Sequence, residues 1–469
     1  MNAMKAGFAT ACITPPPGKD IPGLFERRLA LGVHDDLYVR AAALDDGTKI
    51  ALVQVDAIVV PEQVVKQARK EAQRLCGIPA AQCFIAATHT HSGGPLFGGF
   101  LSEPDETYMA FVAGQIAAAI SEAFRLSRPA LTGWGRAEAP GVAFNRRFLM
   151  KDGKQRTHPG KLHPDIVAPV GPEDPSVTVL TLGDPDTFAP FGCIVNFACH
   201  ATHMNGLLYS ADYIKGVVDT LQGVYGPDFG VVFLNGACGD VTQVDNRSSR
   251  PMELGPWWAE RTGRCVGGAA IQAVAGTEYR RGVSLDCKSV QARAAIRPVP
   301  ADTLRKAKQV LRKEAPNAEN VETIYANESI LVDALAKKQP YRRLEIMGVR
   351  VGDGLFWGVP AEFFQAFAQE VACASPFPYT CCAELANGYN GYICAEAAFD
   401  GGGYEIRTAR SSFLEEKAGS KVVKAATALC RKMHDAAGQK MTSLQPVWPQ
   451  YRDDSVLDGI NQLGGKKRK

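Results

Sequence analysis

Two tight pairs of histidines, each directly after a short apolar run, constrain the fold of this chain more than any other feature. One pair follows the run CFIAAT and the other follows FGCIVNFA; the pairs are His89 with His91, and His200 with His203. Apolar runs of this length are typical of buried strands, and residues two apart in a strand share a face. Because polar residues at strand ends gather at one edge of an α/β sheet, we expect a fold that carries both pairs into one pocket.

The histidine pairs predict a metal site. The chain has eight histidines, and half of them lie in these two pairs. A single His beside a strand is usually a hydrogen-bonded core residue or a helix cap, and that alternative stays open here. Neutral imidazole is the commonest zinc ligand, and the cysteines show no paired CxxC spacing that would form a structural zinc cage. The pattern favours one Zn²⁺ per chain.

Apolar runs of strand length alternate with longer helical patterns, which predicts an α/β fold of mixed sheets flanked by helices. In the first part of the chain the predicted strands are residues 49–60, 83–88, 176–182 and 191–198, and residues 230–240 are predicted as a strand that runs into a glycine-rich turn. The predicted helices are 62–76, 105–126 and 213–225. In the second part they are a strand at 283–293, a hairpin at 344–358, and helices at 301–314, 317–338, 363–373 and 412–433. We expect one domain over residues 1–440 and an irregular tail over 441–469.

Composition and termini narrow the classes of protein. A net charge of +3 is too small to indicate nucleic acid as a partner. The sequence contains no run of about 20 apolar residues, and its first residues lack the apolar core of a signal peptide. Thirteen scattered cysteines suit reduced thiols. We therefore expect a cytoplasmic protein without stable membrane association, although a signal segment missing from this sequence stays an alternative.

Five motifs carry a resemblance to a known family. The segments ATHTHSGG, NFACHATHM, LNGACGDVT, GVPAEF and LANGYNGY, in this order, resemble the catalytic domain of neutral, non-lysosomal ceramidases over roughly residues 5–435. The opening ITPPPG and GVHDDLYVRAAALDD are more similar to smaller bacterial relatives than to the ceramidases proper. The resemblance implies a ceramidase-like catalytic domain without the family's C-terminal β-domain.

The resemblance also implies a ligand set for a single catalytic zinc. Matched position by position, the ligands are His89, His200, Glu362 and Tyr404. Two imidazoles, a carboxylate and a phenolate leave room for a water, as a catalytic zinc requires. Each oxygen ligand has an alternative interpretation: Glu362 as a carboxylate at a helix N-terminus, and Tyr404 as a packed aromatic beside a run of glycines.

Further residues match the polar helpers of the family's site. His91 would transfer protons or hold the substrate, and Arg146 would neutralise charge on the attacked carbonyl, unless it is a surface cation. Thr242 stands where ceramidases have a Ser near the scissile amide, so the resemblance implies a catalytic role for its hydroxyl, provided that the pocket tolerates the added methyl group. We expect Asn145 to bind substrate beside Arg146, and His203 to contact substrate or to support a ligand, with a structural role equally open.

These inferences predict a zinc hydrolase that cleaves the amide bond of a small soluble substrate rather than long-chain ceramide. We expect its pocket to be lined by polar groups such as Arg146, His91 and His203, which would disfavour a long acyl chain. One alternative is an esterase or lactonase that uses the same zinc site. Another is a metal-dependent binding protein without catalysis. A nucleotide site at Gly401 to Gly403 is not favoured, because no GxGxxG follows a strand there.

Overall fold

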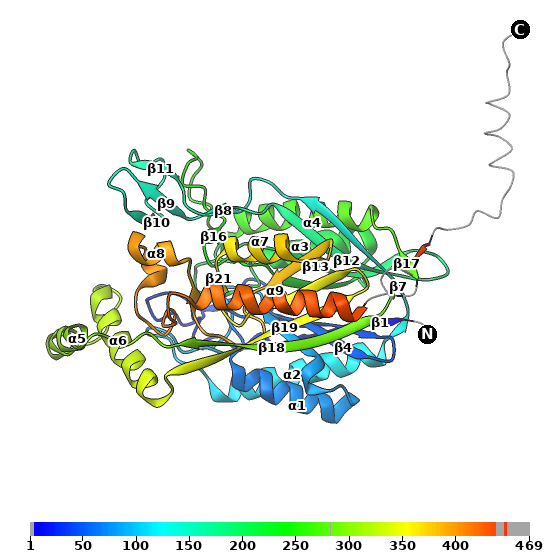
Figure 1. Cartoon of the computed structure of the whole chain (residues 1–469), viewed down its shortest axis with the longest axis horizontal. Coiled ribbons are helices and arrows are strands. Elements are labelled where there is room, and N and C mark those ends of the chain that lie inside the picture. Colours follow the sequence, from blue (N-terminus) through cyan, green and yellow to red (C-terminus); the bar gives the residue numbers. More distant parts are fainter. Residues whose placement is uncertain (1–3, 282, 438–444, 448–469) are drawn as a thin grey trace, which may run out of the picture.

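Two β-sheets packed face to face, each covered on its outer side by a pair of helices, form the centre of the protein (Figure 1). The structure is a computed structural model, and it describes residues 4–281, 283–437 and 445–447. A third sheet and its own helices close one side of this four-layer arrangement. The α/β fold class predicted from the sequence is therefore confirmed.

The first sheet carries the histidine pair of residues 89 and 91 at its edge. Its strand order is β5-β4-β3-β1-β6, with β4 and β5 parallel and the other neighbours antiparallel. The strands are β1 (Lys5–Cys12), β3 (Tyr38–Asp45), β4 (Lys49–Val55), β5 (Cys83–Ala87) and β6 (Arg128–Pro129). The outer face is covered by α1 (Glu62–Cys76) and α2 (Glu106–Arg125). Helix α1 begins after Pro61 and ends at Gly77, whose φ of 70° is left-handed, so both boundaries follow from residue chemistry.

The second sheet carries the other histidine pair. Its order is β15-β13-β12-β7-β17-β24, and only β13 and β15 run parallel. The strands are β7 (Leu131–Glu138), β12 (Ser176–Gly183), β13 (Pro190–Phe197), β15 (Gly230–Asn235), β17 (Arg280–Arg281) and β24 (Gln445–Pro446). Helices α3 (Tyr213–Tyr225) and α4 (Pro256–Ala275) cover it. They approach so closely that a Cβ on Gly263 would lie 2.6 Å from the Cα of Gly216.

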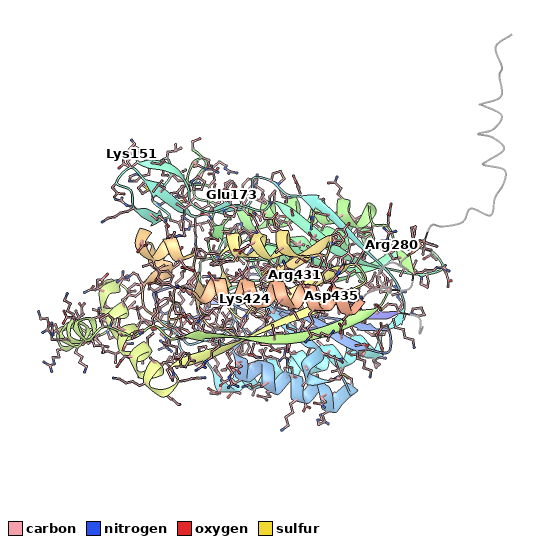
Figure 2. The ribbon with its side chains drawn as sticks, viewed as in Figure 1. Lys151, Glu173, Arg280, Lys424, Arg431 and Asp435 are labelled. Atoms are coloured by element: carbon pink, nitrogen blue, oxygen red, sulfur yellow. The ribbon has the colours of Figure 1, made fainter. Side chains whose placement is uncertain are left out.

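The third sheet supplies the remaining side of the site. Its order is β18-β19-β20-β22, formed by β18 (Leu285–Ala295), β19 (Tyr341–Val351), β20 (Gly354–Gly358) and β22 (Tyr379–Ala383). Helices α7 (Gln365–Ala374) and α9 (Ala418–Ala437) pack beside it. Figure 2 shows Lys424 and Arg431 on the exposed side of α9. A shared core fills the space between the three sheets; it includes Leu52, Phe84, Ile194, Val232 and Phe356.

Shorter elements surround this frame. Helices α5 (Ala301–Lys313) and α6 (Val321–Lys338) extend to the left in Figure 1, and the three-stranded sheet β10-β9-β11 lies above them in that view. Its strands are β9 (Arg147–Met150), β10 (Gln155–Thr157) and β11 (Ile166–Pro169). The other short elements are β2 (Gly32–Val33), β8 (Phe144–Asn145), β14 (Leu208–Tyr209), β16 (Val241–Thr242), β21 (Glu362–Phe363), β23 (Tyr392–Ile393), α8 (Glu396–Gly401), η1 (Ala80–Gln82) and η2 (Tyr404–Ile406).

Several sequence predictions concern element boundaries. The helix predicted at 62–76 has those bounds, whereas the strand predicted at 49–60 ends at Val55. The predicted tail, residues 441–469, lies outside the described residues except for 445–447, which contain β24. The division into one domain and a tail stays a prediction. Within the described part of the chain, no helix is long and apolar enough to cross a membrane.

Candidate metal centre

The ends of three strands hold the two histidine segments together. His89 follows β5 and His200 follows β13, each at the carboxyl end of a strand with a parallel neighbour. The His91 backbone N–H donates to the carbonyl of Ala201 at 3.0 Å, so the two loops pair directly. At the end of β15, the Asn235 side chain donates to the carbonyl oxygens that precede each His, those of Thr88 at 3.0 Å and Cys199 at 3.1 Å.

His89 and His91 point into one pocket, but not for the reason that the sequence indicated. We expected a strand with a two-residue period to place both on one face. Strand β5 ends at Ala87, and His89 has a left-handed backbone with φ of 67°. Gly23 makes the room, because a Cβ there would lie 2.8 Å from His91 Nδ1. The outcome is a distance of 3.4 Å between the Nε2 atoms of His91 and His89.

Three potential ligand atoms meet in a buried space. The Nε2 atoms of His89 and His200 are 3.1 Å apart, and Glu362 Oε2 lies 3.3 Å from the first and 3.5 Å from the second. Each Nδ1 donates to a backbone carbonyl, that of Ile58 at 2.8 Å and that of Cys238 at 2.6 Å. In a neutral ring whose Nδ1 carries the proton, Nε2 is an acceptor, and the two Nε2 atoms face each other and a carboxylate.

This arrangement fits a cation better than a proton. One N–H on His89 Nε2 can point at only one of its three neighbours, which are His200, Glu362 and His91. A metal ion accepts electron pairs from all of them at once, and the N and O donors are those that zinc prefers. The Nδ1 hydrogen bonds to carbonyls also fix the ring orientation, as outer partners of metal-bound His do. His91 joins His89 and His200 in a buried cluster that could hold a metal ion.

The electrostatics of the donors point the same way. Burial, with Arg146 and His89 nearby, lowers the pKa of His200 to about 3, so its ring is neutral. Burial opposes ionisation of Glu362, yet the neighbouring His89 holds the pKa of this carboxyl well below its ordinary value. Burial lowers the pKa of His89, but Glu362 outweighs it and raises that pKa above its ordinary value, so the cluster favours a positive charge beside the carboxylate; a divalent cation supplies that charge.

Glu362 is held in place from several sides. It lies on the short strand β21, and the Tyr389 hydroxyl donates to its Oε1 at 2.8 Å. Gly239 packs against its backbone, where a Cβ would lie 2.9 Å from the Glu362 carbonyl carbon. The carboxylate of Glu384 accepts the backbone N–H groups of Cys238 and Phe363, both at 2.9 Å. Burial raises the pKa of Glu384 to about 7. Glu384 thus joins the loop behind His200 to the strand that carries Glu362.

A cavity of about 140 Å³ opens beside these donors. His89, His91, Glu362 and Tyr404 line it together with mainly apolar and aromatic residues, which are Leu24, Phe25, Ile58, Phe97, Phe100, Tyr389 and Tyr392. The expectation of a polar pocket is therefore wrong. Residues 23–25 and 97–100 come from loops whose position the sequence pattern did not indicate.

Tyr404 reaches the cavity from η2. The residue as a whole is 38% exposed, but its hydroxyl is buried and shares a hydrogen bond with Tyr392. Burial of the hydroxyl outweighs the nearby Arg146 and raises the pKa of Tyr404 above its ordinary value. Its hydroxyl can thus act as a hydrogen-bond donor, or as a ligand once a metal ion lowers that pKa.

Arg146 and Asn145 lie behind the cavity rather than in its lining. Arg146 is buried; it donates to Glu405 Oε1 at 3.1 Å, to the Gly239 carbonyl at 2.6 Å and to the Tyr392 hydroxyl at 3.1 Å. The burial of Arg146 excludes the alternative that it is a surface cation. Asn145, on β8, donates to Asp240 at 2.8 Å. Both side chains brace the loops around the donors.

Thr242 and His203 also lie outside the cavity lining formed by the described residues. Thr242, on β16, donates to the Gln243 side chain at 2.8 Å; its neighbour Val241 accepts the His200 backbone N–H at 3.1 Å. His203 is fully buried, with Nδ1 2.6 Å from Asp212 and Nε2 3.0 Å from Thr262. Since both its nitrogens have protein partners, this placement favours the structural role for His203.

Sequence reasoning missed three residues that hold the donors in place: Asn235, Glu384 and Tyr389. Asn235 lies in LNGACGDVT and Tyr389 in LANGYNGY, and Glu384 directly precedes the second motif. A polar residue that ends an apolar strand, as Asn235 does after GVVFL, was the available signal. Their partners come from distant parts of the chain, which no local pattern indicates.

Comparisons with known proteins identify the fold. No protein-family model and no curated protein sequence matches the chain. Among solved structures, neutral ceramidase from Pseudomonas aeruginosa is similar with a TM-score of 0.72 and 17% identity, covering 96% of this chain and 79% of that one. A ceramidase complexed with C2 is similar with a TM-score of 0.70 and 19% identity, covering 92% and 76%. The ceramidase-like fold predicted from the motifs is confirmed.

Proposed function

We propose that this protein is a zinc-dependent hydrolase that cleaves an amide bond. The observation that carries the proposal is the convergence of two imidazole Nε2 atoms and a carboxylate oxygen, 3.1 to 3.5 Å apart, with no proton able to serve them all. The fold shared with proteins named as ceramidases supports an amide as the bond. When bound, zinc supplies Lewis acidity that polarises a carbonyl and activates water.

Four residues would hold the metal in this proposal. His89, His200 and Glu362 supply the inner donors, and Tyr404 supplies the fourth, as the family resemblance implies. His91 is the competing fourth ligand, because its Nε2 lies 3.4 Å from His89 Nε2. The metal contents of His91→Ala and Tyr404→Phe, measured side by side, separate the two assignments.

If Tyr404 is the ligand, His91 is left to move a proton. His91 lines the cavity beside the donors, and its Nδ1 has no hydrogen-bond partner among the described residues. Its Nε2 faces the donors, 3.4 Å from His89 Nε2, so this nitrogen can take a proton from water and return it to the leaving nitrogen. Arg146 then acts indirectly, through two tyrosines. It lies 5.2 Å from the Tyr404 ring centre and donates to the Tyr392 hydroxyl, so it positions both phenols.

The cavity volume sets the size of the group that reaches the metal. About 140 Å³ admits a short acyl chain together with the scissile bond. The aromatic lining favours an apolar acyl group. This supports a small amide substrate rather than long-chain ceramide, although for a different reason from the polar lining that the sequence predicted.

A panel of short N-acyl amines and matched esters tests the proposal. We expect the zinc-loaded protein to hydrolyse short-chain amides, and the chelated protein to regain activity when zinc is restored. Faster turnover of every ester than of its matched amide would favour the esterase or lactonase alternative. Stoichiometric zinc with no turnover of either series would contradict catalysis and favour a metal-dependent binding protein.

A further inference from the structure

A second compartment adjoins the metal cavity. We call it the outer groove; it has a volume of about 340 Å³ and is lined by Pro61, Glu62, Gln63, Lys66, Phe97, Arg342 and Tyr389. Phe97 and Tyr389 also line the metal cavity, and their rings meet edge to face with centres 5.0 Å apart. Tyr389 is held by its hydrogen bond to Glu362. A molecule that passes this aromatic pair therefore contacts both compartments.

Arg342 presents an anchored cation to the outer groove. It lies on β19, and its Nε donates to Asn390 Oδ1 at 2.7 Å while Nη1 donates to Gln339 at 3.1 Å. Asn390 is buried and donates to the Pro360 carbonyl at 3.1 Å, so the anchor is rigid. Nη2 forms a loose ion pair with Glu62, 3.8 Å from its Oε2 and beyond hydrogen-bond distance. The guanidinium is thus oriented, with donor capacity left for an anion.

The charges of the groove select a monoanion. Glu62 and Lys66 form an ion pair at 2.6 Å on the first turns of α1, so they largely neutralise each other. Arg342 leaves one positive charge in excess. A carboxylate balances that charge and matches the planar guanidinium, whereas a phosphate dianion would exceed it and meet Glu62.

We propose that the outer groove binds a carboxylate on the substrate, so that the substrate class is an N-acyl amino acid. This inference rests on the proposed function. The short acyl group would occupy the aromatic metal cavity, and the carboxylate would reach Arg342 past Phe97 and Tyr389. In the reaction the oxygen of water bonds to the acyl carbon, the C–N bond breaks, and the leaving nitrogen takes a proton. The products are a carboxylic acid and a free amino acid.

Matched substrates and a matched variant test this assignment. N-butanoylglycine carries the carboxylate, and N-butanoylglycinamide replaces it with a neutral amide. The corresponding derivatives of β-alanine and 4-aminobutanoate place the carboxylate farther from the scissile amide. We expect kcat/KM to be at least about tenfold higher for the best carboxylate than for its amide. Arg342→Gln should remove that preference through KM. Arg343→Gln is the control, because Arg343 is exposed and points to the other face of β19.

A binding measurement separates failure of this inference from failure of the proposed function. Calorimetry on the chelated full-length protein should give about tenfold weaker binding of the best carboxylate ligand to Arg342→Gln than to Arg343→Gln, with the neutral amide bound equally by both. That result upholds the groove even if no amide is hydrolysed. Equal binding of carboxylate and amide, or equal losses in both variants, would overturn the carboxylate site even if hydrolysis is found.

Discussion

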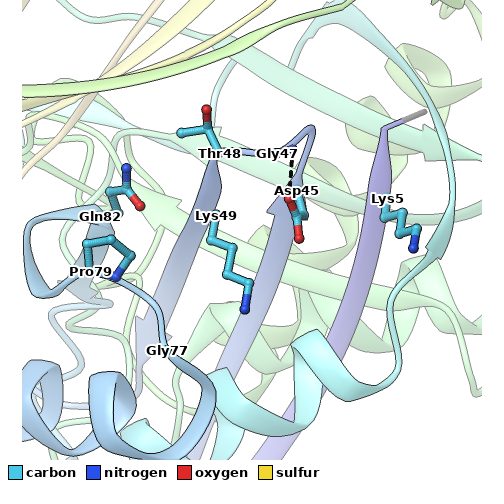
Figure 3. A pocket seen from close by; sticks show the side chains of 8 residues that line it. All are labelled: Lys5, Asp45, Gly47, Thr48, Lys49, Gly77, Pro79 and Gln82. Atoms are coloured by element: carbon cyan, nitrogen blue, oxygen red, sulfur yellow. Dashed lines mark hydrogen bonds between the residues drawn. The ribbon is translucent and has the colours of Figure 1, made fainter. Parts of the chain in front are cut away.

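The two ends of the parallel strand pair β4 and β5 carry two very different cavities. At the amino end lies an open cavity of about 770 Å³, lined by Lys5, Asp45, Lys49 and Gln82 among others (Figure 3). Two of its polar side chains have partners nearby: Asp45 accepts the Gly47 N–H at 2.8 Å, and Lys49 donates to the Cys76 carbonyl at 2.9 Å. At the carboxyl end lies the metal cavity, with only about 140 Å³.

The two cavities show that volume does not identify the functional site. The distinguishing feature of the smaller cavity is that polar atoms from distant segments meet there without hydrogen-bond partners for all of them. At the amino end the side chains of Asp45 and Lys49 are paired with nearby backbone groups. At the carboxyl end two imidazole nitrogens and a carboxylate oxygen from three distant segments face one another, and a single proton cannot serve all three. Such an arrangement is costly unless a cation completes it. Substitutions at the two ends should therefore have very unequal effects.

The largest effect is expected from removal of an inner donor at the carboxyl end. His89→Ala or His200→Ala should lose most of the bound zinc and more than about 10³ in rate, because catalytic zinc is poorly held once one of its protein ligands is lost. Metal analysis and turnover measure both. His163→Ala, at a half-buried His outside this cluster, is the control. Full zinc occupancy in both donor variants would contradict the assignment of the metal site to the carboxyl end of β4 and β5.

His91→Ala should separate proton transfer from metal binding. If His91 moves protons, the variant keeps its zinc and loses about 10²–10⁴ in rate. Tyr404→Phe should instead lose metal. The reverse result, with zinc lost from His91→Ala and kept in Tyr404→Phe, would make His91 the fourth ligand. Unchanged turnover with intact metal would give His91 a structural role.

The bracing of the histidine loops can be tested with two asparagines of the same chemistry. Asn235 donates to the carbonyls before His89 and His200, and Asn196 donates to those of Leu234 and Cys382, both at 2.8 Å. Replacing either with Ala should lower the free energy of unfolding by about 2–4 kcal/mol, because two carbonyls lose their donor. Only Asn235→Ala should also weaken zinc binding, by about 10–100-fold. Equal zinc affinities would show that Asn235 braces only the fold.

A smaller effect is expected at Thr242. The Thr242 hydroxyl donates to Gln243, and Thr242→Ser keeps that donor while removing a methyl group. If the hydroxyl alone matters, steady-state rates should change by less than about threefold or improve. A loss of tenfold or more with short amides would show that the methyl group shapes the substrate site.

The smallest effect is expected at the amino end. Lys49→Gln removes a cation that lines the large cavity, whose Nζ donates to the Cys76 carbonyl. Zinc content should stay the same and kcat/KM should change by less than about twofold, since substitutions away from a site act weakly. A tenfold loss of activity at constant zinc would mean that the large cavity takes part in function.

Local signals explain how much of the fold could be predicted from the sequence. Helix α1 has an apolar stripe through Val64, Ala68 and Ala72 and ends at a glycine, so its bounds were predictable. Helix α4 was missed because its interior contains Gly263, which lowers helix propensity. That glycine is required by the close approach to Gly216 of α3, a contact that only the tertiary structure defines.

The candidate site also has features that the sequence predicted and features that depend on tertiary structure. The meeting of His89 and His200 followed from strand ends, since parallel neighbours bring carboxyl ends to one edge. The left-handed backbone of His89 and the aromatic lining depend on loops that reach the cavity from elsewhere, including Gly23 and Phe97. Those positions follow from long-range packing, which motif spacing does not encode.

Anomalous X-ray diffraction at the zinc absorption edge, from crystals of protein purified without chelator, tests the central claim most directly. We predict one anomalous peak per chain, about 2.0–2.2 Å from His89 Nε2, His200 Nε2 and a carboxylate oxygen of Glu362. The absence of a peak at these atoms, or a zinc peak confined to another part of the chain, would contradict the account.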